Sequence, residues 1–324
     1  MTLLTRRAAL AALTLTGTSL RAQPAPASLL TLIVPYSPGG PADVLARQME
    51  PGLRKSLGQT VIVENVAGAS GALGIQKLLA GPADGSKLML GTPSDVILAP
   101  LSLAAVKHKP TQLRLVGVVN RGPLVMVAGS HLPYARIEDL MQAIGKRETR
   151  PLTYGSIGPG SLYHLAGEDF AARVHATMTH VPYRGMAPVI QDLIGGQVDV
   201  AFLASAGNLA EYIDKGRLRA LAVANDVRVA RLPNVPTFAE VGLSDFRYEM
   251  WGGIFLPRTA SVEVAQRINA AVNDVLNDPG MRSFNEASGS LHGPQLSLAD
   301  ADKYFNEQIT RFQKLARAVK LDPQ

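Results

Sequence analysis

The sequence predicts an α/β fold divided into two lobes, and three observations support this class. Short apolar segments typical of buried strands alternate along the chain with longer segments of helical periodicity. The 324-residue chain exceeds the usual size of a single hydrophobic core, so two lobes are expected. Two glycine-rich loops, at residues 37–41 and 155–161, each follow a strand-like segment and precede a helical one.

The N-terminal segment, residues 1–27, is predicted to be a secretory signal and no part of the folded protein. Arg6 and Arg7 precede a short apolar run, and small residues follow at Ala22 and Ala27, which are both plausible cleavage points. A membrane anchor would need roughly 20 apolar residues, and this run is shorter. The paired arginines resemble a twin-arginine signal, so the export route stays open. We therefore expect a soluble protein outside the cytoplasm.

The composition excludes several functional classes. Removing the three arginines of the leader lowers the formal net charge from +6 to +3, and only 5% of the chain is aromatic. Because there is also no basic run, the chain lacks the footprint of nucleic-acid binding. The absence of cysteine excludes disulfides and lipid attachment, and no segment after the leader is apolar over the length of a membrane span.

Three histidines, His164, His175 and His180, raise the question of a metal site. They match no metal-binding motif, and no cysteine is present to complete one. A strand over residues 174–181 would place His175 and His180 on opposite faces. A glycine repeat at residues 68–74 differs from the G-x-G-x-x-G of dinucleotide folds, so neither a metal nor a cofactor is expected.

The first glycine-rich loop has the pattern of an anion cradle. Residues 32–34 predict a buried strand, and Gly39 and Gly40 permit a tight turn. Pro41 suits the first turn of a helix, where Asp43 would place a carboxylate near the positive end of the dipole. The N–H groups at such a helix start lack partners within the helix, so they can bind a carboxylate or phosphate. The alternative is an ordinary strand-to-helix turn without a ligand.

The next strand of this part of the chain adds two hydroxyl groups. It covers residues 87–91 and ends at Thr92, and Ser94 is expected to cap the helix that follows. Because ligands gather at the carboxyl ends of parallel strands, both hydroxyls join the first loop as candidates. The other elements expected before the second loop are a strand at 61–65, helices at 68–80 and 137–144, and strands at 114–120 and 124–128.

The second glycine-rich loop repeats the architecture of the first. A strand ends at Tyr154, and Ser161 is expected to cap a helix whose first turn carries His164. If each loop belongs to its own lobe, the two helix starts can face each other across a cleft and bind one small anion from both sides. Residues 155–158, Gly-Ser-Ile-Gly, do not match the G-x-S-x-G of hydrolases, so a nucleophilic Ser156 is disfavoured.

Two residues of the second half have competing interpretations. Arg184 is either a cationic partner for an anionic ligand or a solvated residue at the rim, and the rim is favoured. Trp251 is favoured as a core residue over a platform for the ligand. A basic, polar segment at 145–150 is expected to be an exposed turn. The remaining elements expected are a helix at 187–194, strands at 198–203 and 219–224, and helices at 262–277 and 298–319.

A set of short motifs also occurs in a fixed order along the mature chain. Their positions are 35–43 (Pro-Tyr-Ser-Pro-Gly-Gly-Pro-Ala-Asp), 63–65 with Gly68, 82–85, 154–161 with His164, 181–185 (Val-Pro-Tyr-Arg-Gly), 218–223 and 235–237. Together they resemble the Bug-type extracytoplasmic solute receptors, the substrate-binding components of tripartite tricarboxylate transporters. The resemblance covers essentially the whole mature chain.

This resemblance implies a type II-like periplasmic binding protein. Such a protein has two lobes of mostly parallel sheets with helices on both faces, joined by crossing strands that form a hinge. The first lobe would comprise residues 28–123 and 225–324, and the second lobe residues 124–224. The resemblance implies a periplasmic receptor, expected to be a monomer, that captures a small carboxylate and presents it to the membrane subunits of the transporter. Backbone amides, hydroxyls and ordered water would hold the carboxylate, and no cofactor is implied.

The resemblance also carries over to individual positions. In the first lobe the implied contacts are Tyr36, Ser37, Gly39, Gly40, Pro41, Ala42 and Asp43, with Thr92 and Ser94 behind them. In the second lobe they are Ser156, Gly158, Gly160, Ser161 and His164, with Tyr183 on the wall of the cleft. Ala42 stands where the family often has Thr, and the strand that ends at residues 202–205 lacks the usual Asp or Asn. Both departures make the pocket more apolar, so we expect a ligand with a larger hydrophobic part than citrate or aspartate.

Two alternative functions would use the same cleft. A ligand sensor for a membrane signalling partner needs the same closing motion, and the sequence does not separate it from a transport receptor. An exported hydrolase with His164 as its base would instead turn over a bound ester or acid. The sequence names neither the carboxylate nor the membrane partner.

Overall fold

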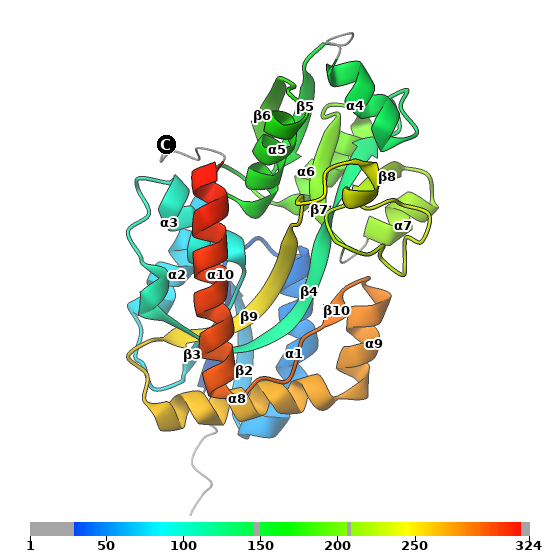
Figure 1. Cartoon of the computed structure of the whole chain (residues 1–324). Helices are drawn as coiled ribbons and strands as arrows, with labels where there is room; N and C mark the ends of the chain where they lie inside the picture. Colours follow the sequence, from blue (N-terminus) through cyan, green and yellow to red (C-terminus); the bar gives the residue numbers. More distant parts are fainter. Residues whose placement is uncertain (1–28, 146–149, 206–208, 319–324) are drawn as a thin grey trace, which may run out of the picture.

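The computed structural model describes residues 29–145, 150–205 and 209–318. The predicted leader, most of the predicted turn at 145–150 and the last residue of the predicted C-terminal helix lie outside these ranges. The described chain forms two layered α/β regions, and strand β4 (Leu113–Gly129) runs through both of them (Figure 1). None of its described helices combines the length and the apolar character needed to cross a bilayer.

The first region contains a sheet in the order β2-β1-β3-β9-β4. β1 (Leu29–Val34) is parallel to β2 (Thr60–Asn65) and to β3 (Lys87–Gly91). β9 (Glu249–Pro257) is antiparallel to β3 and to the first half of β4, and the short β10 (Leu291–His292) pairs with that same half. This sheet is therefore parallel at its outer strands and antiparallel beside β4.

Helices cover both faces of the first sheet because successive side chains of β1 point to opposite sides. Leu32 belongs to a core cluster with residues of α1 (Pro41–Leu57) and α8 (Val262–Asn277). Ile33 belongs to the other cluster, with residues of α2 (Ala72–Leu79), η2 (Ser94–Leu98) and α10 (Leu298–Ala318). The shorter helical elements here are η1 (Ala69–Gly71), α3 (Ala99–Ser102), η3 (Pro110–Gln112) and α9 (Pro279–Ala287).

The second region is built around the other half of β4. β7 (Val200–Ala204) and β8 (Leu218–Val223) are antiparallel to it, and β5 (Leu152–Ser156) is parallel to β7 and to β6 (Met178–Pro182). The core cluster on one face includes α4 (Ile137–Gly145) and α5 (Leu162–Arg173). The cluster on the other face includes α6 (Met186–Gly195) and α7 (Leu209–Asp214).

β4 is one continuous strand, whereas the sequence predicts two strands separated at residues 121–123. Pro123 lacks an N–H, but it lies where the strand leaves its pairing with β9 and begins to pair with β7 and β8. Irregular register against β9 marks bulges that bend the strand. A proline at the junction between two sheets interrupts no backbone hydrogen bond between paired strands. The two predicted strands, at 114–120 and 124–128, can therefore form one continuous strand.

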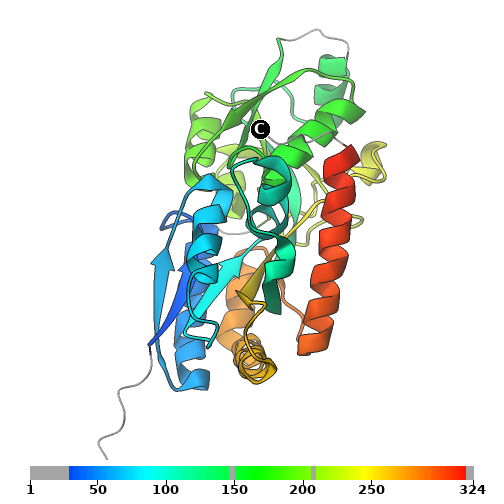
Figure 2. The same ribbon diagram turned by 90° about the vertical axis from the view of Figure 1, so that its left-hand side faces the viewer.

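The chain crosses between the two regions again at residues 224–248. The N–H of Tyr248 donates to the carbonyl of Ala224 at 3.0 Å, and the N–H of Leu124 donates to the carbonyl of Tyr248 at 2.8 Å. An aromatic group packs beside this crossing, in which the rings of Phe238 and Phe246 lie 4.4 Å apart. One core cluster joins side chains of both regions on this side, and α10 runs alongside both (Figures 1 and 2).

Two further local predictions, besides the break in β4, are wrong. The strand predicted over residues 174–181 begins only at Met178, because α5 continues to Arg173 and His175 turns the chain with a left-handed φ of 52°. Ser94 does not cap the helix that begins there, because the cap position of η2 is occupied by Pro93 and no side chain bonds to that helix start.

Candidate functional site

Two cavities that share part of their walls lie between the two regions. The inner cavity has a volume of about 250 Å³, and the outer cavity has a volume of about 640 Å³. The residues that line both of them are Gly40, Pro41, Leu45, Asn120, Met186, Ala187 and Ile190. Because these residues come from α1, β4 and α6, the two cavities form one continuous cleft.

The inner cavity is enclosed by the first loop, the start of α6 and the strands that cross between the regions. From the first region it is lined by Tyr36, Ser37, Pro38, Gly40, Pro41, Ala42, Leu45, Leu90, Thr92 and Asn120. From the second region it is lined by Ile157, Tyr163, Arg184, Gly185, Met186, Ala187, Pro188, Ile190, Leu203, Ala204 and Leu209. It is also lined by Met250, Trp251 and Gly252 of β9. Most of these side chains are apolar, and Arg184 is the one charged residue among them.

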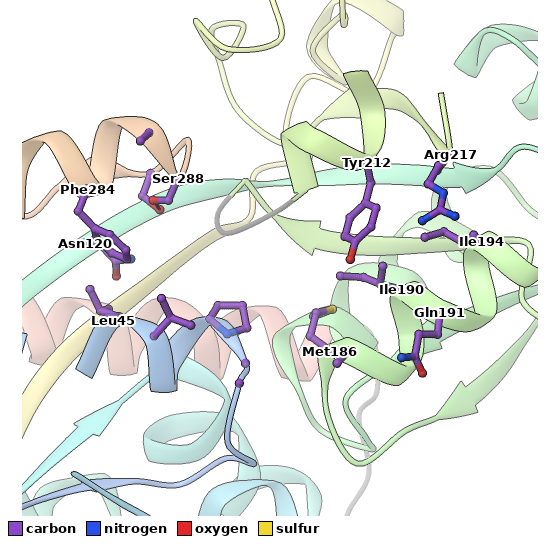
Figure 3. A pocket seen from close by; sticks show the side chains of 17 residues that line it. Leu45, Asn120, Met186, Ile190, Gln191, Ile194, Tyr212, Arg217, Phe284 and Ser288 are labelled. Atoms are coloured by element: carbon purple, nitrogen blue, oxygen red, sulfur yellow. Dashed lines mark hydrogen bonds between the residues drawn. The ribbon is translucent and has the colours of Figure 1, made fainter. Parts of the chain in front are cut away.

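The outer cavity continues from the inner one toward α9. Figure 3 shows Leu45, Phe284 and Ser288 on one side of it, opposite Ile194 and Tyr212 on the other. Gly39 and Val44, at the start of α1, also line this cavity. α9 was not expected from the sequence; its N-cap is Asp278, whose carboxylate accepts the N–H of Gly280 at 2.7 Å.

The start of α1 faces the inner cavity and retains free backbone donors. Gly40 occupies the N-cap position in an extended conformation, no side chain caps the helix, and Pro41 follows at the first helical position. The first helical hydrogen bond runs from the N–H of Val44 to the carbonyl of Gly40 at 3.0 Å. The N–H groups of Ala42 and Asp43 precede that bond, so they are available to an acceptor outside the helix.

Asp43 holds the first loop in place from behind the cavity and lines neither cavity. Its Oδ2 accepts the N–H of Gly39 at 2.9 Å and Nε of Arg47 at 3.1 Å. Arg47 also reaches Asn65, which donates to the carbonyl of Tyr36 at 3.1 Å. Burial opposes ionisation of the Asp43 carboxyl, but the hydrogen bonds from Arg47 and Gly39 outweigh it and lower its pKa.

Of the two hydroxyls predicted after β3, that of Thr92 lies on the wall of the inner cavity, whereas Ser94 lines neither cavity. The hydroxyl of Tyr36 hydrogen-bonds Oγ1 of Thr92 at 2.8 Å. Behind them Asp95 is fully buried, and its Oδ1 accepts the N–H of Thr92 at 2.6 Å, while Oδ2 has no hydrogen-bond partner among the described residues. Burial raises the pKa of Asp95 to about 7, against the opposing effect of the Thr92 bond. No local sequence pattern marks Asp95 as buried, because an acid in the first turn of a helix is normally exposed.

The second loop occupies a different environment from the first. Ser161 caps α5 as predicted, since its hydroxyl accepts the N–H of His164 at 3.2 Å and donates to the carbonyl of Gly158 at 2.8 Å. Ser94 of the first region accepts the N–H of Leu162 at 3.1 Å. Five predicted contacts of this loop line neither cavity; they are Ser156, Gly158, Gly160, Ser161 and His164. The loop reaches the inner cavity through Ile157 and Tyr163 instead.

Ser156 has a histidine partner but no access to either cavity. Its hydroxyl lies 2.7 Å from Nε2 of His180, whose ring stacks on that of His164 with centroids 4.1 Å apart. Burial, together with the neighbouring His164, lowers the pKa of His180 to about 4. Ser156 is only 1% exposed, so its hydroxyl is buried away from solvent. No group of three or more metal-ligating side chains occurs in the described ranges.

The second region presents a different helix start to the cavity, one that the sequence analysis did not select. Gly185 is the N-cap of α6, it has no side-chain cap, and it lines the inner cavity with Arg184 before it and Met186 after it. Tyr183, the contact predicted on this wall, lines neither cavity and donates its hydroxyl to Asp192 at 2.7 Å. The sequence signal for this helix start was a third strand–glycine–helix pattern at residues 181–186, which contains one glycine where the other two loops contain two or more.

Comparison with known proteins places this cleft in a family. The profile of the tripartite tricarboxylate transporter family receptor, TctC, matches residues 45–321. The chain belongs to this family. The protein BugT of Bordetella pertussis is 32% identical over 297 residues, which cover 90% of this chain and 89% of BugT.

Two solved structures are similar to this fold over most of the chain. R. palustris Rpa4515 with adipate superposes with a TM-score of 0.85 at 28% identity, covering 91% of this chain and 98% of that one. MatC from Rhodopseudomonas palustris with bound malate superposes with a TM-score of 0.82 at 26% identity, covering 89% of this chain and 98% of that one.

These findings confirm the predicted family, the two-lobed periplasmic-binding-protein fold and the predicted function. The protein is a carboxylate-binding receptor of the kind that serves tripartite tricarboxylate transporters. The matching family model describes a receptor, and the structures of Rpa4515 and MatC contain adipate and malate.

Proposed function

We propose that this receptor binds a carboxylate with a medium-length or aromatic apolar body inside the inner cavity. The observation that carries the proposal is the lining of that cavity, which combines mostly apolar side chains with a free helix start and one arginine. An apolar wall favours a ligand body that loses little hydration on entry. The expectation of a ligand more apolar than citrate agrees with this lining.

The carboxylate would bind at the start of α1. The N–H groups of Ala42 and Asp43 are the donors there, and the hydroxyls of Tyr36 and Thr92 lie on the same wall. Asp43 would act by fixing Gly39, and the second loop would act by supporting the wall through Ile157 and Tyr163. The carboxylates held by Rpa4515 and by MatC support an anionic ligand for this chain.

Ligand-driven closure would connect binding to transport. We assign residues 28–123 and 225–324 to the first lobe and residues 124–224 to the second, with the hinge at the two crossings between the sheets. A carboxylate that docks on α1 favours the closed form, in which α6 adds contacts from the second lobe. The closed receptor, exported to the periplasm as a monomer, would then present its ligand to the membrane subunits.

Calorimetry on the mature protein tests the proposal. The ligands are hexanoate, adipate, benzoate and citrate, each titrated into the chain from residue 28 onward. We expect the acids with an apolar body to bind at least about tenfold more tightly than citrate, because citrate would bury hydroxyl and carboxylate groups without partners. Tighter binding of citrate than of all three other acids would contradict the proposal.

A further inference from the structure

The charges along the cleft are few and of one sign. Arg184 lines the inner cavity, Arg217 lines the outer cavity, and no acidic residue lines either one among the described residues. The side chains of both arginines are exposed and form no ion pair or hydrogen bond with any described residue. Other arginines near acids are neutralised; Arg150, for example, donates two bonds of 2.8 Å to Asp199. The guanidinium of Arg184 is therefore free to bind a group from outside the protein.

Arg184 and the start of α1 line the same inner cavity from different regions of the molecule. It follows β6 directly and precedes Gly185, the N-cap of α6, so its backbone belongs to the second region. Gly40 and Tyr36 line the same cavity from the first region. Most of the other lining side chains are apolar, with Leu45, Ile157 and Trp251 among them. A ligand that contacts both regions would meet free amide donors from the first region and a guanidinium from the second.

We propose that Arg184 binds a second carboxylate of the ligand, so that the receptor selects diacids over monoacids of the same chain length. This inference rests on the proposed function. A guanidinium matches a carboxylate with two parallel hydrogen bonds, which adds both affinity and orientation. A monoacid would place a methyl group against the guanidinium and remove water from it without supplying an acceptor. Selection would also couple to closure, because the second carboxylate joins Arg184 to the opposite lobe.

Matched pairs of acids separate this inference from the proposed function. The probes are the straight-chain diacids of five to eight carbons and the monoacids of the same lengths, each titrated into the mature protein. The variants are Arg184→Gln and Arg217→Gln, two exposed arginines in the same cleft, and thermal unfolding verifies that both variants fold. For the best-bound length, we expect wild type to prefer the diacid by about tenfold, as charge-assisted bonds of this kind allow. Arg184→Gln should reduce that preference to about threefold or less, and Arg217→Gln should retain it.

Several results would overturn the inference. If wild type binds both acids of each pair equally, or if Arg184→Gln leaves the preference unchanged, Arg184 does not contact a second carboxylate. A preference lost in Arg217→Gln but kept in Arg184→Gln would place the second carboxylate in the outer cavity. These results leave the proposed function intact, since the acids still bind. Failure of every probe to bind wild type, with citrate bound, would contradict the proposed function and this inference together.

Discussion

The two glycine-rich loops share one sequence architecture and occupy opposite environments. Gly39 and Gly40 lie at the mouth of the cleft, and no atom lies within 4 Å of a Cβ built on Gly39. Gly160 is buried against the first region, where a Cβ would lie 2.3 Å from that of Ser102. The first loop therefore presents its helix start to a ligand, whereas the second uses its glycines to let two lobes touch. A strand–glycine–helix pattern predicts free backbone N–H donors at the helix start. The packing around the loop determines whether these donors face a ligand cavity or another part of the protein.

A matched pair of glycine substitutions tests this difference most strongly. Both Gly39 and Gly160 have a left-handed φ, of 79° and 73°. Gly39→Ala adds only backbone strain and should cost about 1 kcal/mol. Gly160→Ala adds the same strain and a collision with Ser102, so we expect a loss of at least about 3 kcal/mol. Urea unfolding of the two variants measures both values, and equal losses would show that the second loop is not packed as described.

The buried acid behind the first loop should make stability depend on pH. An unfolded aspartate titrates near 3.8, and burial raises the pKa of Asp95 to about 7. The folded protein thus retains a proton that the unfolded chain releases, so wild type loses stability as pH rises from about 4 to 7. Asp95→Asn should remove that loss, which we expect to be about 2–4 kcal/mol.

Urea unfolding at pH 4.5, 6 and 7.5 compares wild type with Asp95→Asn. The quantity of interest is the difference between the two curves, because other groups titrate in both proteins. A difference that is constant across this range would show that Asp95 is ionised in the folded protein throughout.

The histidine pair behind the second loop should have the opposite dependence. An unfolded histidine titrates near 6.5, and the pKa of His180 is lowered to about 4. As pH falls from about 6.5 to 4, the unfolded chain binds a proton that the folded protein excludes. The free energy of unfolding of wild type should therefore decrease by about 1–3 kcal/mol. His180→Gln should lose less on acidification, since glutamine still offers a partner to Ser156. His175→Asn, in the exposed turn, serves as the control and should follow wild type.

The smallest effect is expected at Ala42, in the first turn of α1. Ala42→Thr adds a hydroxyl to the inner cavity, which should lower the affinity for octanoate relative to adipate by about threefold. Val44→Thr adds a hydroxyl at a residue that lines only the outer cavity, so the ratio of octanoate affinity to adipate affinity should remain that of wild type. Calorimetry with both acids measures the ratio. A larger change in Val44→Thr would mean that the alkyl chain lies in the outer cavity.

Much of the fold followed from local patterns in the sequence. The apolar strands, the proline at the start of α1 and the serine cap of α5 depend on neighbours a few residues away, and all are present. The continuity of β4 was missed because proline is normally excluded from the interior of a central strand. It is tolerated in β4 because the strand changes its partner strands at Pro123. The cap assigned to Ser94 was wrong, since its hydroxyl bonds Leu162 of the other region. That contact joins residues far apart in the chain, so no local sequence pattern predicts it.

In the candidate site, too, some features follow from local sequence and others from contacts between distant parts of the chain. The first loop was placed on the cavity because its own residues create the free helix start. The choice between α5 and α6 as the opposing helix depends on how the two lobes are oriented, which is a property of the crossings at residues 123–124 and 224–248. Asp95 was missed for a related reason, because its burial arises from Tyr36 and Gly71 packing over it.

A crystal structure of the mature protein with its best-bound straight-chain acid tests the central claim most directly. We predict that one carboxylate lies within hydrogen-bond distance of the N–H groups of Ala42 and Asp43, with the alkyl chain inside the inner cavity toward Arg184. A carboxylate bound at Gly160 and Ser161, or bound only in the outer cavity beside Arg217, would contradict the account.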